Sequence, residues 1–108
     1  VGELDRGASG NMPAGGLIDV QARVYELYAR GSEPDARALQ RELLDLLTYA
    51  AMYGVSFHKH VLWKRGVLTS PSFRDPQATP IDRDDDLAIA RMWKRIEGFA
   101  NPAYPFRA

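Results

Sequence analysis

The chain has 108 residues, which suits one small domain, and its 14 Lys and Arg residues balance its 14 Asp and Glu residues. A net charge of zero gives no basic surface for nucleic acid, and no apolar run approaches the roughly 20 residues that span a bilayer. The absence of cysteine excludes a disulfide framework, a cysteine-based zinc site and a thiol nucleophile. We therefore expect a cytoplasmic protein that binds neither nucleic acid nor membrane.

The N-terminal residues suggest the end of a helix followed by a short, enclosed strand. Residues 1–6 resemble a last helical turn, and Gly7 can take the left-handed conformation that ends it. The small, uncharged residues 7–12 suit a strand of a parallel sheet covered on both faces, although propensity alone favours a loop equally. One buried strand cannot stand alone, because its backbone needs neighbours on both sides. We expect those neighbours outside this chain, and its start at Val1 fits a chain whose beginning lies elsewhere.

Apolar residues recur at helical spacing in four later segments, residues 17–30, 34–53, 56–65 and 83–97. The stripes comprise Leu17, Val20, Val24, Leu27 and Tyr28; Leu39, Leu43, Leu46, Leu47 and Ala50; Phe57, Val61 and Leu62; and Ile89, Met92, Trp93 and Ile96. Ser32 and Asp82 are the predicted N-caps of the second and fourth helices. The proline-rich residues 67–80 predict an extended connector, and the tail from Gly98 is expected to lie as coil against a surface.

Two polar runs are candidates for a catalytic or metal site. His58 and His60 would point about 200° apart on a helix, so they cannot share one metal, and Lys59 between them is expected to be structural. The run Asp84–Asp86 lacks the spaced oxygen ligands of a calcium loop and suits a solvated helix start, where the helix dipole favours anions. We expect no metal and no cofactor.

The run Leu4-Asp5-Arg6-Gly7-Ala8-Ser9-Gly10-Asn11-Met12-Pro13 resembles the end of the barrel in the dihydrodipicolinate synthase / N-acetylneuraminate lyase family. The runs at residues 36–47 and 57–68, and the Arg74-x-Pro76 and Pro80 pattern, are similar to its C-terminal helices and connector. The resemblance covers about residues 4–96.

The resemblance implies an α/β parent fold, a (β/α)₈ TIM barrel with a helical appendage, although this chain is itself mainly α. Residues 1–31 would be the last strand–helix unit of the barrel, and residues 32–108 the appendage and tail. The implied chemistry is that of a Schiff-base lyase, aldolase or dehydratase acting on pyruvate or a related 2-oxo acid. The catalytic lysine and its helping tyrosine would lie outside this chain, so no catalytic residue is expected here. Ser9 and Gly10 match positions that line the substrate pocket, chiefly by their backbone.

The alternative is a free-standing helical interaction module, or a degenerate remnant with a binding or structural role. The unpartnered strand and the stripes of the first two helices would leave an apolar patch and an open strand edge. We therefore expect a homo-oligomer, or association with the missing barrel segment.

Overall fold

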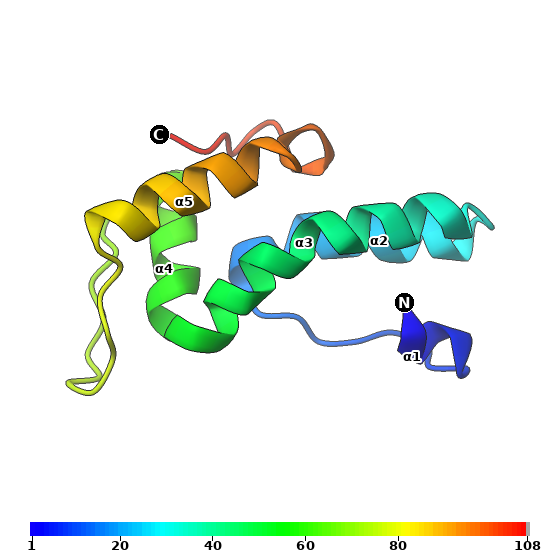
Figure 1. Ribbon diagram of the computed structural model, residues 1–108, viewed down its shortest axis with the longest axis horizontal. Helices are drawn as coiled ribbons and strands as arrows, with labels where there is room; N and C mark the ends of the chain where they lie inside the picture. The colour runs from blue at the N-terminus through cyan, green and yellow to red at the C-terminus, as the bar shows by residue number, and fades with distance from the viewer. Residues whose placement is uncertain (108) are drawn as a thin grey trace.

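The computed structural model describes residues 1–107, which are mainly helical and contain no strand (Figure 1). The elements in chain order are α1 (Gly2–Asp5), the 3₁₀ turn η1 (Gly15–Leu17), α2 (Ile18–Ala29), α3 (Glu33–Tyr53), α4 (Val55–Lys64), α5 (Arg83–Lys94) and the 3₁₀ turn η2 (Glu97–Phe99). In the view of Figure 1, α5 lies on one side of α2 and α3, and α1 lies on the other.

The four longer helices confirm the pattern of apolar stripes, and their bounds lie within three residues of those expected. Gly31 ends α2 at a φ of 85°, and the Ser32 N–H donates to Leu27 O at 2.8 Å. This is the hydrogen bond of a Schellman cap. Asp82 caps α5 as predicted, since its Oδ1 accepts from the Asp85 N–H at 2.8 Å. Ser32 precedes α3 but makes no capping hydrogen bond with its side chain.

A single hydrophobic core joins the helices α2, α3, α4 and α5. Its members are Leu17, Val20, Val24, Leu27, Ala36, Leu39, Leu43, Leu46, Phe57, Val61, Ile89, Trp93 and Ile96. The core crosses residue 31, so the two units expected from the sequence share it. The prediction that the stripes of the first two long helices stay uncovered is wrong, because α2 and α3 pack on each other and on the later helices. The expected homo-oligomer remains a prediction.

The strand predicted near residues 7–12 does not form in this structure. The segment is extended but exposed, and Met12 is 99% exposed. No backbone hydrogen bond within the described chain involves residues 9–12. The physical reason is that a strand exists only through partner strands, and every neighbouring element of this chain is a helix or a loop.

The buried guanidinium of Arg65 holds the C-terminal half of the fold together. It forms two hydrogen bonds to the carboxylate of Asp19 on α2, Nη1 to Oδ1 at 2.9 Å and Nη2 to Oδ2 at 2.5 Å. Its Nε donates to Tyr104 O at 3.0 Å, and its Cζ lies 4.8 Å from the ring centroid of Trp93. The side chain of Arg65 is 4% exposed, so these partners replace water almost completely.

The tail lies against the helices, as expected. The ring of Phe106 stacks on Trp93 with centroids 5.4 Å apart, and the Arg107 N–H donates to Lys64 O at 2.8 Å. Position 108 lies outside the described residues. Among residues 1–107, no helix has both the length and the apolar character needed to cross a membrane.

Substituting Asp19→Asn should lower the free energy of unfolding by about 2–4 kcal/mol at pH 7, because it leaves the buried Arg65 charge without its counter-charge. Urea unfolding followed by far-UV circular dichroism measures this loss. The control is Glu26→Gln, which removes an exposed pair with Arg23 and should cost less than about 0.5 kcal/mol. Equal losses in the two variants would contradict the role assigned to Arg65.

The same pair should make stability depend on acid pH. Burial raises the pKa of Asp19, but hydrogen bonds from Arg65 and from the Asn101 N–H outweigh it, so the pKa lies below the ordinary value of 3.8. A lowered native pKa means that the stabilisation is complete above 3.8 and is lost as pH falls through the native pKa. The difference in unfolding free energy between wild type and Asp19→Asn should therefore shrink as pH falls below 3.8. A difference that stays constant into that range would refute this assignment.

Candidate functional site

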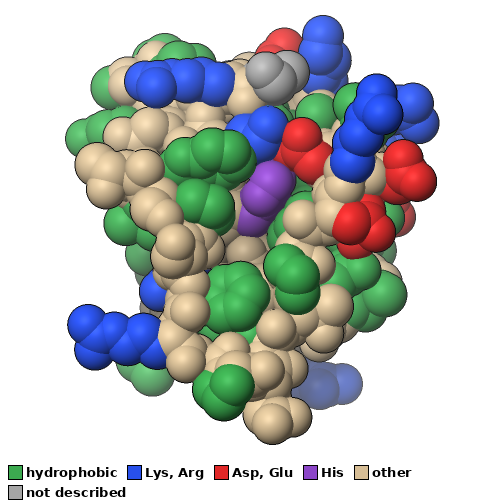
Figure 2. All heavy atoms as spheres, turned by 90° about the vertical axis from the view of Figure 1, so that its left-hand side faces the viewer, with side chains coloured by type: hydrophobic (Ala, Val, Ile, Leu, Met, Phe, Trp, Pro, Cys, Tyr) green, Lys and Arg blue, Asp and Glu red, His purple; other side chains and the backbone are tan. Residues whose placement is uncertain are grey.

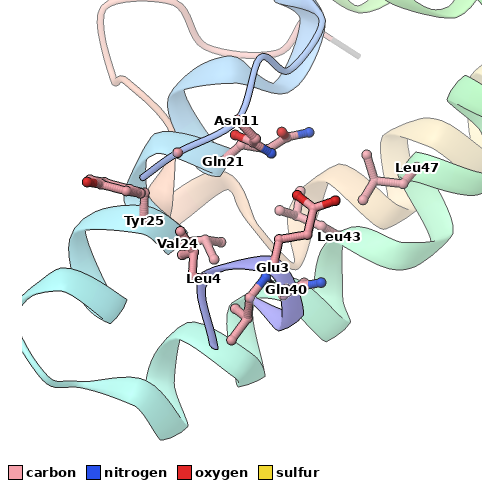
Figure 3. A pocket seen from close by; sticks show the side chains of 11 residues that line it. Glu3, Leu4, Asn11, Gln21, Val24, Tyr25, Gln40, Leu43 and Leu47 are labelled. Atoms are coloured by element: carbon pink, nitrogen blue, oxygen red, sulfur yellow. Dashed lines mark hydrogen bonds between the residues drawn. The ribbon is translucent and has the colours of Figure 1, made fainter. Parts of the chain in front are cut away.

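The predicted substrate-binding residues lie at the edge of a cavity between the N-terminal segment and the α2–α3 pair. Gly10 lines this cavity, which has a volume of about 290 Å³, and Ser9 lies exposed beside it outside the lining. Figure 3 shows the cavity enclosed by α1 and residues 10–11 on one side, and by α2 and α3 on the other. The structure thus brings Gly10 to a concave site and leaves Ser9 outside it.

The cavity combines amide groups with apolar side chains. Asn11, Gln21 and Gln40 contribute the amides, while Val24 and Leu43 contribute part of the core as its floor. A lining of this kind can bind a small molecule through hydrogen bonds to an amide, while an apolar part rests on the floor. Glu3 is the one ionisable side chain in the lining besides the phenol of Tyr25. The site as formed is suited to binding.

Surface contacts hold α1 over this cavity. Asp5 accepts a hydrogen bond from Arg37 Nη2 at 2.8 Å and from the Tyr28 hydroxyl at 3.0 Å. These hydrogen bonds, with the one from Arg37 first, lower the pKa of Asp5. All the partners lie at the surface, where such contacts contribute little to stability. No residue of α1 is buried. Val1, directly before α1, packs against the core and donates from its amino group to Gln40 Oε1 at 2.7 Å, which is the one half-buried contact of this wall in the described chain.

The two histidines lie at helix interfaces and on separate sides of α4. His60 is buried, and its Nε2 lies 2.8 Å from Asp86 Oδ1 on α5. His58 is half-buried against Gly16, and burial lowers its pKa. Its Nδ1 is buried without a hydrogen-bond partner in the described chain. Lys59 has a structural contact, since its Nζ donates to Ser72 O of the connector at 2.9 Å.

The acidic run at the start of α5 is not simply a solvated helix end. Asp86 also accepts from Lys64 Nζ at 3.0 Å. Burial raises the pKa of Asp86, but hydrogen bonds from Lys64 and His60 outweigh it and lower the pKa overall. Asp85 accepts from the Tyr53 hydroxyl at 2.6 Å, which raises the pKa of that phenol to about 12. Two of the three carboxylates therefore join α5 to α3 and α4, and only Asp84 fits the expectation of a solvated side chain.

Sequence reasoning missed the side chains that line the cavity. Gln21, Val24 and Tyr25 share one face of α2, while Gln40, Leu43 and Leu47 share one face of α3. The sequence itself contains this spacing, which places a face of mixed polar and apolar residues beside each stripe. What the sequence could not give is the course of residues 8–12 over these faces, since a coil segment has no periodicity to read.

Within residues 1–107, no three or more His, Asp or Glu side chains gather in a way that could hold a metal ion. No protein-family model, no curated protein and no solved structure matches the chain.

Two glycines at this end of the fold should respond differently to alanine. A Cβ at Gly10 meets no atom within 4 Å, so Gly10→Ala should change the unfolding free energy by less than about 0.5 kcal/mol. A Cβ at Gly16 would lie 2.8 Å from His58 Nδ1 and 3.3 Å from His58 Cα. Gly16→Ala should therefore cost about 1–3 kcal/mol. Thermal or urea unfolding of both variants measures the contrast, and a large loss in Gly10→Ala would mean that the N-terminal segment packs more tightly than described.

Proposed function

We propose that this chain is the C-terminal part of a Schiff-base lyase, aldolase or dehydratase that acts on pyruvate or a related 2-oxo acid. In this proposal residues 7–12 are the last strand of a barrel, α2 is the last barrel helix, and α3, α4 and α5 form a helical appendage. The catalytic lysine lies outside the chain.

The observation that carries the proposal is the state of residues 9–12. Their backbone makes no hydrogen bond within the described chain, and Met12 projects almost wholly into solvent. Unpaired backbone and a bare apolar side chain are typical of a strand that lacks its sheet. The helices that follow do not need such a partner, because their apolar stripes are covered within this chain. The last strand and helix of a barrel, without the rest of that barrel, would form an unpaired segment of this kind directly before a well-packed helical unit.

The proposal assigns Ser9 and Gly10 a substrate-binding role through their backbone. Active sites of (β/α)₈ barrels form at the C-terminal ends of the strands, which is where the proposed last strand would lead. Ser9 and Gly10 lie within that strand, at positions that line the substrate pocket in the family that the sequence resembles. The lack of a side chain at Gly10 lets a carboxylate or keto oxygen approach the main chain closely. Nothing in the packing of this chain requires glycine there, which leaves ligand approach as a reason for it.

The closed core favours the alternative of a free-standing helical module with a binding or structural role. Helices α2, α3, α4 and α5 bury their stripes on one another without help from another chain. Under this alternative, residues 1–14 are a largely exposed arm that contributes no buried member to the core and contacts it through Val1. The two hypotheses differ in the length of the natural polypeptide and in whether that polypeptide forms a Schiff base.

An antibody raised against this chain should detect, in cells of its source, a polypeptide long enough to include a barrel, roughly 250 residues or more. When that polypeptide is incubated with pyruvate and borohydride, a lysine outside residues 1–108 should carry the reduced adduct, because an imine with a 2-oxo acid is the proposed intermediate. Peptide mass spectrometry locates the adduct.

The isolated chain of 108 residues is the matched control, and its three lysines, Lys59, Lys64 and Lys94, should stay unmodified. Detection of the antigen only as a product of 108 residues would refute the proposal and support the helical module. An adduct on Lys59 or Lys64 of the isolated chain would refute the placement of the catalytic lysine.

A further inference from the structure

The contact between η1 and α4 contains a histidine nitrogen without a partner. His58 lies half-buried on α4, and its Nδ1 is shielded from solvent without a hydrogen-bond partner in the described chain. A Cβ on Gly16 would lie 2.8 Å from this nitrogen, so the imidazole packs directly on the bare main chain of η1. Leu17, the next residue of η1, is fully buried, which places the contact at the edge of the core.

This contact accommodates a neutral imidazole better than a charged one. A neutral histidine carries one ring proton, which can lie on Nε2 and leave Nδ1 as an acceptor. A charged histidine carries a proton on both nitrogens, and at Nδ1 that proton would be buried on a cation without an acceptor. Burial is the only cause that lowers the pKa of His58, so no neighbouring charge contributes to the shift.

The elements packed against α4 carry no charge that could stabilise a proton on this ring. Among the helices and turns of the described chain, these elements are η1 and α3. Residues 7–18, which include η1, contain no ionisable side chain. In residues 46–53 of α3, the only ionisable groups are the phenols of Tyr49 and Tyr53, and the Tyr53 hydroxyl donates to Asp85.

Two cations of α4 and its C-cap are bound to other partners. Arg65 lies beside η1, with its Nη1 3.5 Å from Gly16 O, but the carboxylate of Asp19 neutralises it. Lys59 donates to the main chain of the connector at 2.9 Å. Neither cation is free to respond to the charge state of His58.

The other histidine of α4 has a different environment. Figure 2 shows the side of the molecule formed by the connector and the start of α5, where acidic and basic side chains lie close together. His60 Nε2 lies 2.8 Å from a carboxylate oxygen of Asp86, and Lys64 Nζ lies 3.0 Å from the other oxygen. A proton taken up by His60 therefore has a carboxylate beside it, whereas a proton on His58 has none.

We propose that the contact between His58 and Gly16 is a pH-sensitive latch, which holds η1 on α4 while His58 is neutral and opens when His58 takes up a proton. The charged ring turns toward water, where it is hydrated, and η1 loses its support on α4. Residues 1–14 join the helices through η1, so opening also loosens the base of that segment. The latch is independent of the proposed lyase chemistry, because both of its groups belong to the helical part of this chain.

The lowered pKa of His58 sets the direction of the response. In the open latch the imidazole is hydrated and titrates near its ordinary value of 6.5, whereas in the closed latch it titrates below that value. The closed state is therefore fully favoured above pH 6.5, and it is progressively lost as pH falls through the lower pKa of the closed state.

NMR of the 108-residue chain, titrated from about pH 7.5 to about pH 4.5, tests the latch across the range in which a histidine changes charge. The His58 ring protons should report a pKa below 6.5. The nuclear Overhauser contact between this ring and the Gly16 Hα protons should be present at the start and lost with the same midpoint. A pKa at or above 6.5, or a contact that persists after His58 has titrated, would overturn the proposal.

Two variants separate His58 from the rest of the chain. His58→Phe keeps a ring against Gly16 but cannot take up a proton, so its contact with the Gly16 Hα protons should persist throughout the titration. His60→Gln is the matched control, because it removes the other histidine of the same helix and keeps a hydrogen-bonding group beside Asp86. The folded His60→Gln chain should lose the contact as wild type does. Loss of the contact in His58→Phe, or its persistence at low pH in folded His60→Gln, would refute the assignment to His58.

Discussion

The ion pair between Arg65 and Asp19 is the interaction on which the rest of the structure depends. The guanidinium follows the last turn of α4, its carboxylate partner stands on the first turn of α2, and Trp93 of α5 covers its face. Asp19 also accepts the Asn101 N–H at 2.7 Å, and Arg65 donates to Tyr104 O, so the same pair fixes the tail. A buried charge tolerates few arrangements of its partners. The pair therefore sets the position of α4, α5 and the tail relative to α2, while apolar contacts supply most of the stabilisation.

The chain divides by physical character into a packed part and a largely exposed part. From Leu17 onward, apolar stripes are buried and the helix ends are capped or tied to neighbouring elements. Residues 1–14 contribute no member of the buried core. Exposed ion pairs and hydrogen bonds hold them in place, together with Val1, which packs against the core and donates from its amino group to Gln40 Oε1 at 2.7 Å. The cavity beside Gly10 exists because this segment crosses the α2–α3 pair without packing into it. The contrast between the two parts underlies the proposal that residues 7–12 belong to a sheet supplied by another part of the protein.

The sequence predicted the helices well because their signals are local. The stripe from Leu39 to Ala50, the glycine at position 31 and the cap at Asp82 each act within a few residues. The links between helices were not predicted, because nothing in a single sequence pairs Arg65 with Asp19 or His60 with Asp86 across long separations. The predicted strand does not form, because strand formation depends on residues far away in the sequence or outside the chain. Its residue types suit a covered sheet, but pairing depends on partner strands, and propensity alone left a loop equally favoured. At the candidate site, Gly10 was predicted through the resemblance. Asn11, Gln21 and Gln40 were not predicted, because only the folded chain brings them to one cavity.

The most direct test of this account is amide hydrogen exchange of the 108-residue chain, measured residue by residue by NMR. Amides within α2, α3, α4 and α5 should be protected to a common level set by global unfolding, because one core unites these helices. Amides of residues 9–12 should exchange at the rates of an unstructured peptide, because they have no hydrogen-bond partner in the chain. Strong protection of residues 9–12 in the monomeric chain would contradict the account, since it would mean that the segment is already paired and needs no sheet from elsewhere.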